Sequence, residues 1–291
     1  MLAIKEGELF ESRDAGCSWT VVASLPNEFY HLSVTGDQTA VAWFRKQRTQ
    51  LVQLGGSVTP GPVLRFEIVG LVRNPLVTGG AILIDERGVV FTSSDIGQRW
   101  LGVGNPVPAD PDQPLALATV ALVAPDDPNH IFFGRVLDGG AWVSLDQGDT
   151  WFNPVGIGDA TREIEVLAAA FGPAGTSVLW VLAEVRASDG LPQTRSLYRS
   201  EDGGLSFVEL PGIEDGFTLP RGVPMAADPV DSDIVYFGEI SPCSVRVVRY
   251  DHGPGTIEVI SSGSVGFATE FIFSPASSDY IYMPVGRLVG C

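Results

Sequence analysis

The middle of the chain reads Ser144-Leu145-Asp146-Gln147-Gly148-Asp149-Thr150-Trp151. The same order of serine, aspartate, glycine and a final aromatic residue returns in three other stretches, which begin at Ser12, Ser93 and Ser200. Successive copies lie at intervals of roughly 50 residues or more, a period typical of solenoids and propellers. Because each such unit is one supersecondary structure, the repeat predicts an architecture built from copies of one small sheet.

The repeated stretch has four defining positions, and each has a physical role in a tight turn. An aspartate at the start of a turn accepts hydrogen bonds from the backbone amides that follow it. The glycine permits a positive φ, and the aromatic side chain folds back as an apolar anchor. We therefore expect a structural role for these positions, which are Ser12, Asp14, Gly16, Trp19, Ser93, Asp95, Gly97, Trp100, Ser144, Asp146, Gly148, Trp151, Ser200, Asp202, Gly204 and Phe207.

Short apolar or alternating runs surround the repeats and predict strands. Residues 81–85 form an apolar run, residues 86–88 a tight turn, and residues 89–92 a second strand that enters the repeat at Ser93. Residues 2–4 and 8–10 have the same form near the N-terminus. Helical periodicity is nearly absent, and the run 164–171 also favours a strand because of its neighbours. The chain is therefore predicted to be all-β.

A second marker, usually a residue followed by proline, alternates with the repeats. It lies between two apolar runs each time, which indicates a corner, because proline lacks the amide donor that central strand pairing needs. The corners are Asn74-Pro75, Ala124-Pro125, Gly172-Pro173, Asp228-Pro229 and Ser274-Pro275, with Thr35-Gly36-Asp37 in the same slot earlier in the chain. Two degenerate turns, residues 54–57 and 250–253, complete the alternation.

The alternation leaves a gap at each end of the chain, because the first turn has no corner before it and the last corner has no turn after it. A ring in which the N- and C-terminal strands pair fills both gaps, with residues 270–274 completing the blade begun by residues 1–24. We therefore predict a single domain, residues 1–291, that is a β-propeller of four-stranded antiparallel blades. Six blades are favoured, and seven stay open because residues 280–286 and 2–5 both resemble the second strand of a blade.

The motif Ser-x-Asp-x-Gly-x-Thr-Trp resembles the Asp-box, or BNR repeat, of sialidases, xyloglucan-hydrolysing enzymes, sortilin (VPS10-type) receptors and photosystem II assembly factors. The corner segment 123–133 is more similar to the last three groups than to sialidases. This resemblance implies a β-propeller in which the repeated turns join the third and fourth strands of each blade, away from the usual ligand face. It bears on architecture, because these relatives differ widely in activity.

Composition argues against several classes of partner. The formal net charge is −17, whereas phosphate binding needs clustered lysine and arginine, so nucleic acid is not expected. No run of about 18 apolar residues predicts a membrane span. The start lacks the features of a signal peptide, so we expect either an extracytoplasmic protein whose leader is absent from this chain or a cytoplasmic one. Cys17 and Cys291 would form a disulfide if the ring closes, and the alternative is that Cys17, Cys243 and Cys291 are separate thiols.

Charged residues enter the predicted inner strands near the channel mouth, where propellers usually bind their ligands. The predicted ligand-binding residues are Arg65, Arg162, Glu163, Arg221 and Glu270. Three arginines in equivalent positions can bind a carboxylate or sulfate through bidentate contacts. The alternative is that they pair with neighbouring glutamates as a solvated rim.

These observations predict a monomeric, non-catalytic binding or scaffold module that recognises a protein or glycan at the channel mouth. We expect no cofactor or metal, since the three histidines stand apart without metal-ligand spacing. The alternative is a glycoside hydrolase that acts on polysaccharide through a carboxylate pair. Its candidate acids are Asp110, Asp112, Asp159, Asp189, Glu214 and Asp215. Sialidase activity is not expected, because the Arg-Ile-Pro signature is missing.

Overall fold

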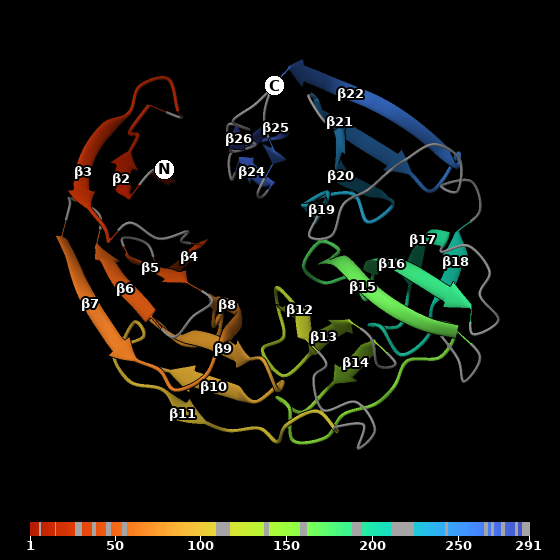
Figure 1. Ribbon diagram of the computed structural model, residues 1–291, viewed down its shortest axis with the longest axis horizontal. Coiled ribbons are helices and arrows are strands. Elements are labelled where there is room, and N and C mark those ends of the chain that lie inside the picture. The colour runs from red at the N-terminus through yellow and green to blue at the C-terminus, as the bar shows by residue number, and fades with distance from the viewer. Residues whose placement is uncertain are drawn as a thin grey trace. The chain divides into compact units, whose positions relative to one another are not determined.

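The computed structural model describes residues 1–5, 7–14, 16–26, 31–36, 39–44, 48–53, 57–108, 117–136, 140–157, 162–187, 194–210, 224–241, 244–264, 267–268, 271–274, 277–282 and 285–286. All regular secondary structure in these ranges is β-strand (Figure 1). No helix among them has the length and apolarity needed to cross a bilayer. The predicted all-β class is therefore confirmed.

The chain forms two compact units, and the first comprises residues 1–108, 127–129 and 145–150. Its three sheets follow one another along the chain, and every strand pairs antiparallel with its neighbour in sequence. The strands are β1 (Leu2–Lys5), β2 (Glu8–Glu11) and β3 (Thr20–Ser24); β4 (His31–Gly36), β5 (Thr39–Phe44), β6 (Arg48–Gln53) and β7 (Ser57–Val63); and β8 (Ile68–Arg73), β9 (Ala81–Asp85), β10 (Val90–Ser93) and β11 (Leu101–Gly102).

The second unit comprises residues 109–126, 130–144 and 151–291 and has the same organisation. Its larger sheets contain β12 (Leu117–Val123), β13 (Ile131–Val136) and β14 (Ala141–Ser144); β15 (Arg162–Phe171), β16 (Leu179–Ala187), β17 (Thr194–Ser200) and β18 (Val208–Leu210); and β19 (Met225–Ala227), β20 (Ile234–Ser241), β21 (Ser244–Asp251) and β22 (Thr256–Ser264). Two small pairs follow, β23 (Phe267–Ala268) with β26 (Val285–Gly286), and β24 (Ile272–Ser274) with β25 (Ser277–Tyr282).

The predicted alternation of corners and turns matches the order of strands in the sheets. Asn74-Pro75 lies between the first and second strands of its sheet, β8 and β9, and the Asp95 turn lies between the third and fourth, β10 and β11. Gly172-Pro173 and the Asp202 turn take the same places in the sheet β15–β18. Of the degenerate turns, residues 250–253 join β21 to β22, and residues 54–56 lie outside the described ranges.

A backbone hydrogen bond ties the repeated turns to the corners of their own sheets. In three of the four repeated turns, the residue after the aspartate donates its N–H to a corner carbonyl, in the pairs Ile96 to Gly79 (2.9 Å), Gln147 to Asn129 (2.9 Å) and Gly203 to Ser177 (2.8 Å). His252, in a turn that lacks the repeat pattern, donates in the same way to Asp233 (2.9 Å). We call this interaction the corner bond. It shows that the turn 250–253 is equivalent to the repeated turns.

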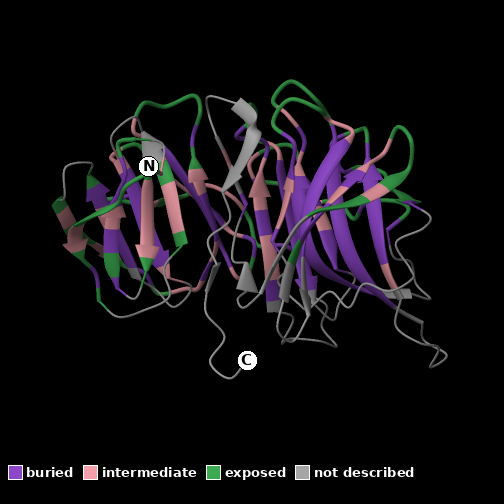
Figure 2. Cartoon of the chain, turned by 90° about the horizontal axis from the view of Figure 1, so that it is seen from above, coloured by how far each residue is buried: buried purple, intermediate pink, exposed green. Residues whose placement is uncertain are grey.

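The apolar core of each unit lies between consecutive sheets. In the first unit, Val41 and Trp43 of β5 pack with Leu83 of β9. In the second, Trp180 of β16 packs with Val235 and other buried residues of the next sheet. Burial of one such side chain contributes about 1.5–3 kcal/mol, so the sheets stabilise one another face to face. Most buried residues lie on the strands, and exposed residues lie both in the connections and on outer strands such as β18 (Figure 2).

The described strands near the two ends of the chain do not establish how many blades there are, so the number of blades stays a prediction. Among the described residues, β24 pairs with β25 and β23 with β26, and none of these strands pairs with β1, β2 or β3. Pairing of the terminal strands is therefore not confirmed. Cys17 is an exposed free thiol, and Cys243 and Cys291 lie outside the described ranges.

Candidate functional site

The residues predicted to bind a ligand at the channel mouth are only partly described. Arg65 is exposed in the connection between β7 and β8. Arg162 and Glu163 begin β15, opposite Ala187 and Arg186 of β16, but their side chains are outside the described part of the structure. Arg221 and Glu270 are outside it as well, as are all six acids proposed for a hydrolase. The three-arginine site therefore stays a prediction.

The carboxylates of the four repeated turns accept hydrogen bonds from residues close in sequence. Asp146 Oδ1 accepts from the backbone N–H of Thr150 at 2.8 Å, and its Oδ2 accepts from the Thr150 hydroxyl at 2.5 Å. Asp202 makes the same two bonds with Ser206, at 2.8 and 2.5 Å. Asp14 makes them with Ser18, at 2.9 and 2.6 Å. These oxygens are therefore engaged within their own turns.

The serine that opens the turn adds a second local network. The Ser93 hydroxyl donates to Asp95 Oδ1 at 2.8 Å and accepts the N–H of Gly97 at 2.9 Å. Ser12 and Ser200 make the equivalent pairs of bonds in their turns. The glycine adopts the left-handed conformation, with φ of 85° at Gly97, as the pattern predicted.

Hydrogen bonds within the turn lower the pKa of three of these carboxyl groups, Asp14, Asp95 and Asp202. Hydrogen bonds from the Ser18 hydroxyl, the Ser18 amide and the Ser12 hydroxyl lower the pKa of Asp14 to about 2. Burial alone would raise the pKa of Asp202, but hydrogen bonds from Ser206 and Ser200 outweigh it and the pKa is lowered. A carboxylate that is ionised and hydrogen-bonded within its own turn is suited to stabilising the hairpin. Their structural role remains our prediction.

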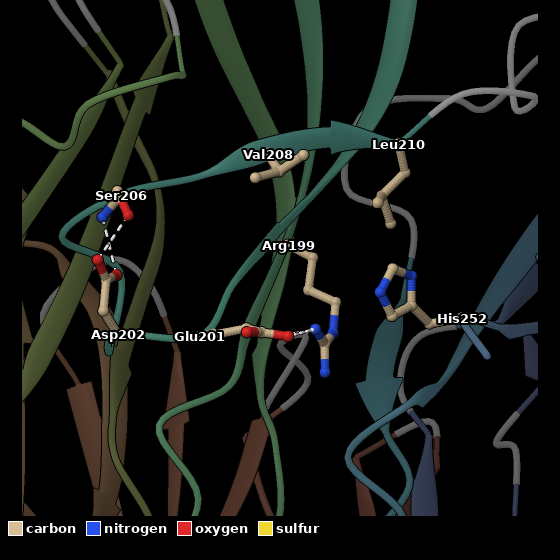
Figure 3. A pocket seen from close by; sticks show the side chains of 7 residues that line it. All are labelled: Arg199, Glu201, Asp202, Ser206, Val208, Leu210 and His252. Carbon is tan, nitrogen blue, oxygen red and sulfur yellow. Dashed lines mark hydrogen bonds and ion pairs between the residues drawn. The ribbon is translucent and has the colours of Figure 1, made fainter.

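A pocket of about 360 Å³ lies beside the Asp202 turn in the second unit. We call it the β17–β18 pocket, because most of its walls come from these two strands and the turn between them; His252, from the turn after β21, closes it. Figure 3 shows Arg199 and His252 opposite one another across it. The lining residues are Arg199, Glu201, Asp202, Ser206, Val208, Leu210 and His252.

Arg199 is the best-buried charge of the pocket. Its side chain is only 7% exposed, and its guanidinium forms ion pairs with Glu201 and with Asp233, the latter at 2.7 Å. The guanidinium carbon also lies 5.3 Å from the centre of the Trp180 ring, within cation–π distance. These three contacts fix the guanidinium. Its Nε is nevertheless buried and has no hydrogen-bond partner among the described residues.

An aromatic cluster stands behind Arg199. The Trp180 ring centre lies 6.0 Å from that of Tyr250 and 6.1 Å from that of His252, with the rings nearly perpendicular. Trp180 Nε1 and His252 Nδ1 are both buried, and neither has a hydrogen-bond partner within the described part of the chain. Buried polar atoms are usually hydrogen-bonded, so three of them in one cluster indicate a place for an additional acceptor.

The charge around the pocket is negative despite its arginine. Glu201 and Asp202 line it, and Asp233 holds the far side of the guanidinium, so three carboxylates face one cation. Glu201 is 76% exposed and Val208 68% exposed, so the rim combines acidic and apolar groups. Sequence reasoning missed this site, because Arg199 and His252 are distant in sequence and the turns beside them were expected to be structural.

A second arrangement of charges lies within the strands of the same sheet. Glu165 of β15 and Glu184 of β16 are directly opposite in the antiparallel register, and both are buried. Arg195 of β17 pairs with Glu184 at 3.2 Å. No group of three or more histidine, cysteine or acidic residues in the described ranges is arranged to hold a metal ion.

Comparison with known proteins finds relatives of two kinds, and no protein-family model matches the chain. The Dispase autolysis-inducing protein of Streptomyces mobaraensis is 28% identical over 296 aligned residues, covering 97% of this chain and 76% of that protein. A xyloglucanase of a Paenibacillus species is 24% identical over 218 residues, covering 69% of this chain. The chain matches only 20% of the length of that xyloglucanase.

Solved structures with a similar fold include the GH74 xyloglucanase from Xanthomonas campestris, with a TM-score of 0.68 at 12% identity, covering 97% of this chain and 48% of that one. YCF48 from Cyanidioschyzon merolae has a TM-score of 0.66 at 14% identity, covering 97% and 86%. YCF48 bound to D1 peptide has a TM-score of 0.55 at 12% identity, covering 88% and 75%. With the repeated four-stranded antiparallel sheets, these similarities support a β-propeller fold.

Proposed function

We propose that this chain is a non-catalytic binding module that recognises another protein. The observation that carries the proposal is the β17–β18 pocket, where buried hydrogen-bond donors have no partner in the described structure. The two carboxylates that line it are already engaged, Glu201 by Arg199 and Asp202 by Ser206. A general acid needs a raised pKa, whereas the pKa of Asp202 is lowered. The pocket is therefore better suited to binding than to hydrolysis.

The comparisons support a protein ligand more than a glycan. The relative that aligns with nearly the whole chain is named for an effect on Dispase. A solved structure of similar fold is YCF48 bound to D1 peptide. A propeller that is a scaffold for loops and pockets can serve such recognition without catalytic groups. A monomeric, extracytoplasmic protein remains our expectation.

Two parallel assays test this function. A phage-displayed peptide library and a glycan array are each screened against the purified chain, and turnover is measured on xyloglucan and other β-glucans. We expect peptides to be enriched, with no glycan bound and no sugar released. Specific binding to glycans with no peptide enriched would replace the protein ligand by a carbohydrate. Turnover of any polysaccharide would contradict the proposal that the chain is non-catalytic.

A glycoside hydrolase is the second candidate, and the opposed pair Glu165 and Glu184 favours it. Directly opposite residues of an antiparallel pair have Cβ atoms about 4.5–5.5 Å apart, which is compatible with the carboxylate spacing of retaining enzymes. Both side chains are buried, so a substrate would need access that the described structure does not provide. If xyloglucan is cleaved, Glu165→Gln and Glu184→Gln should each abolish cleavage while Glu8→Gln leaves it unchanged.

A further inference from the structure

The β17–β18 pocket has features that point to one class of ligand. Its guanidinium is held in place by two carboxylates and the Trp180 ring, so the unpartnered Nε–H is a rigid donor that keeps its direction when a ligand arrives. A preorganised donor loses little freedom on binding and selects an acceptor oxygen. A backbone carbonyl of a peptide is such an acceptor, and it is neutral.

The charge of the pocket selects against an acidic ligand. Two carboxylates pair with the single guanidinium and a third, Asp202, lines the pocket, and the whole chain carries a formal charge of −17, so an anion is repelled on approach and a cation is attracted. Asp202 Oδ2 accepts from the Ser206 hydroxyl, and Glu201, which pairs with Arg199, is 76% exposed. A carboxylate has several acceptor sites, so both groups can also accept from an ammonium or guanidinium group.

Exposed apolar residues lie in the β17–β18 segment and in the chain bonded to it. Val208 lines the pocket and is 68% exposed. Val155 is 73% exposed and Leu205 39%, and the two are held side by side by a hydrogen bond from the Val155 amide to the Leu205 carbonyl at 2.9 Å. The volume of about 360 Å³ is at the lower end for ligand pockets, which fits a short segment of chain rather than a folded domain.

From this combination we propose that the β17–β18 pocket binds a short extended peptide segment in which a lysine or arginine is flanked by apolar residues. Glu201 and Asp202 receive the cationic side chain. The Arg199 Nε–H donates to a backbone carbonyl of the segment, with His252 facing it across the pocket. The exposed Val208, which lines the pocket, covers a flanking aliphatic side chain. The proposal rests on the proposed protein-binding function and names the chemistry of the partner.

Isothermal titration calorimetry with three synthetic pentapeptides tests the ligand. All are acetylated and amidated, with leucines on both sides of a central lysine, norleucine or glutamate. We expect the lysine peptide to bind with a Kd below about 1 mM and the other two at least tenfold more weakly. Binding of the lysine peptide should weaken as salt rises, because exposed charges are screened. Equal affinity for the lysine and glutamate peptides, or no binding of the lysine peptide at 1 mM, overturns the proposal.

Matched variants test the site. Glu201→Gln removes one exposed charge at nearly constant shape, and His252→Phe keeps an aromatic ring while removing its nitrogens. Each should raise the Kd of the lysine peptide at least threefold, whereas Glu8→Gln, an exposed glutamate of the first unit, should leave it unchanged. Near-ultraviolet circular dichroism confirms that each variant is folded. An effect of Glu201→Gln no larger than that of Glu8→Gln overturns the site.

The peptides enriched from the phage library separate this proposal from the function on which it rests. If they bind equally to the parent chain and to Glu201→Gln and His252→Phe, the chain binds proteins elsewhere and the pocket proposal fails alone. If no peptide is enriched and none of the pentapeptides binds, both proposals fail. If a glycan binds and competes at the pocket, the ligand class is wrong while the site is retained for another chemistry.

Discussion

Asp146 and the aspartates of the three other repeated turns are bonded within their own hairpins. Asp146 accepts two hydrogen bonds from Thr150, one from the backbone and one from the hydroxyl. Two other copies make the same two bonds, with Ser206 and Ser18 in the place of Thr150. In the remaining copy, Asp95 accepts the backbone N–H of Arg99 at 2.9 Å. At residue scale, we predict that the repeat serves to satisfy amides that a tight turn leaves without strand partners.

Replacing Asp146 by alanine is expected to lower the free energy of unfolding by about 1–2 kcal/mol, since the amide and hydroxyl of Thr150 lose their acceptor. Urea unfolding followed by tryptophan fluorescence measures the change. Asp149→Ala, an exposed aspartate in the same turn, is the control and should stay within about 0.5 kcal/mol of the parent. Equal effects of the two substitutions would contradict a bracing role for Asp146.

Two turns hold a non-glycine residue in the left-handed region. Ile96 and Gln147 both have φ of 61°, while the equivalent residue in the fourth copy is Gly203, with φ of 75°. A β-branched residue in this region is strained, whereas asparagine tolerates it. We expect Ile96→Asn to raise the free energy of unfolding by about 0.5–1 kcal/mol. Gly203→Ala should lower it, because a Cβ there would lie 2.5 Å from His130 Cε1. Denaturant titration of both variants checks the opposite signs.

At the scale of the elements, the sheets approach one another where glycine allows it. A Cβ on Gly134 of β13 would lie 2.7 Å from Val166 Cγ1 of β15. The Thr119 hydroxyl donates to the carbonyls of both Gly134 and Val166, at 3.2 and 2.8 Å, which shows how closely β12, β13 and β15 meet. The close contact between these consecutive sheets therefore depends on the missing side chain.

Gly134→Ala is expected to lower the free energy of unfolding by about 1–3 kcal/mol, because the added methyl group overpacks the contact with Val166. Adding Val166→Ala makes room, so the double variant should lose less than the sum of the two single variants. A thermodynamic double-mutant cycle from urea unfolding measures this coupling. Simple additivity would show that the two positions do not meet.

The elements were largely predictable from sequence, and the pocket was not. Apolar runs and proline corners locate β9, β10 and β15 because local chemistry decides a strand and a turn. The β17–β18 pocket forms where Arg199 and His252, 53 positions apart in the chain, come together through packing of two sheets. No short sequence pattern predicts that two residues so far apart will lie in one pocket. Whether the three arginines of the predicted site come together likewise depends on the tertiary structure, which their separate positions in the sequence do not reveal.

At the scale of the whole molecule, the two compact units are interleaved along the chain. Residues 127–129 and 145–150 group with the first unit although the strands around them belong to the second. We predict one domain, and therefore one cooperative unfolding transition, whose calorimetric and van't Hoff enthalpies agree. Differential scanning calorimetry measures both. Two separable transitions would indicate two domains instead.

The lowered pKa values of the turn aspartates predict loss of stability in acid. A carboxylate whose pKa is lower in the folded state stabilises that state above its unfolded pKa, and this contribution disappears as pH falls through the folded value. For Asp14 the window runs from the ordinary value of 3.8 down to about 2. Urea unfolding at pH 7 and at steps between pH 4 and 2 should show Asp14→Asn less stable than the parent at pH 7, with the difference shrinking in acid. A constant difference would contradict this assignment.

The corner bond also has a consequence for how such proteins diverge. It joins backbone atoms, so any residue other than proline can make it, and His252 makes it in a turn that keeps Asp251 and Gly253 but has lost the serine and the aromatic residue of the motif. Mutations can therefore replace the motif residues in one copy after another while the hairpin keeps its structure. Proteins of this architecture should therefore diverge faster in sequence than in structure. Main-chain geometry is then the better criterion for counting the duplications from which their repeats arose.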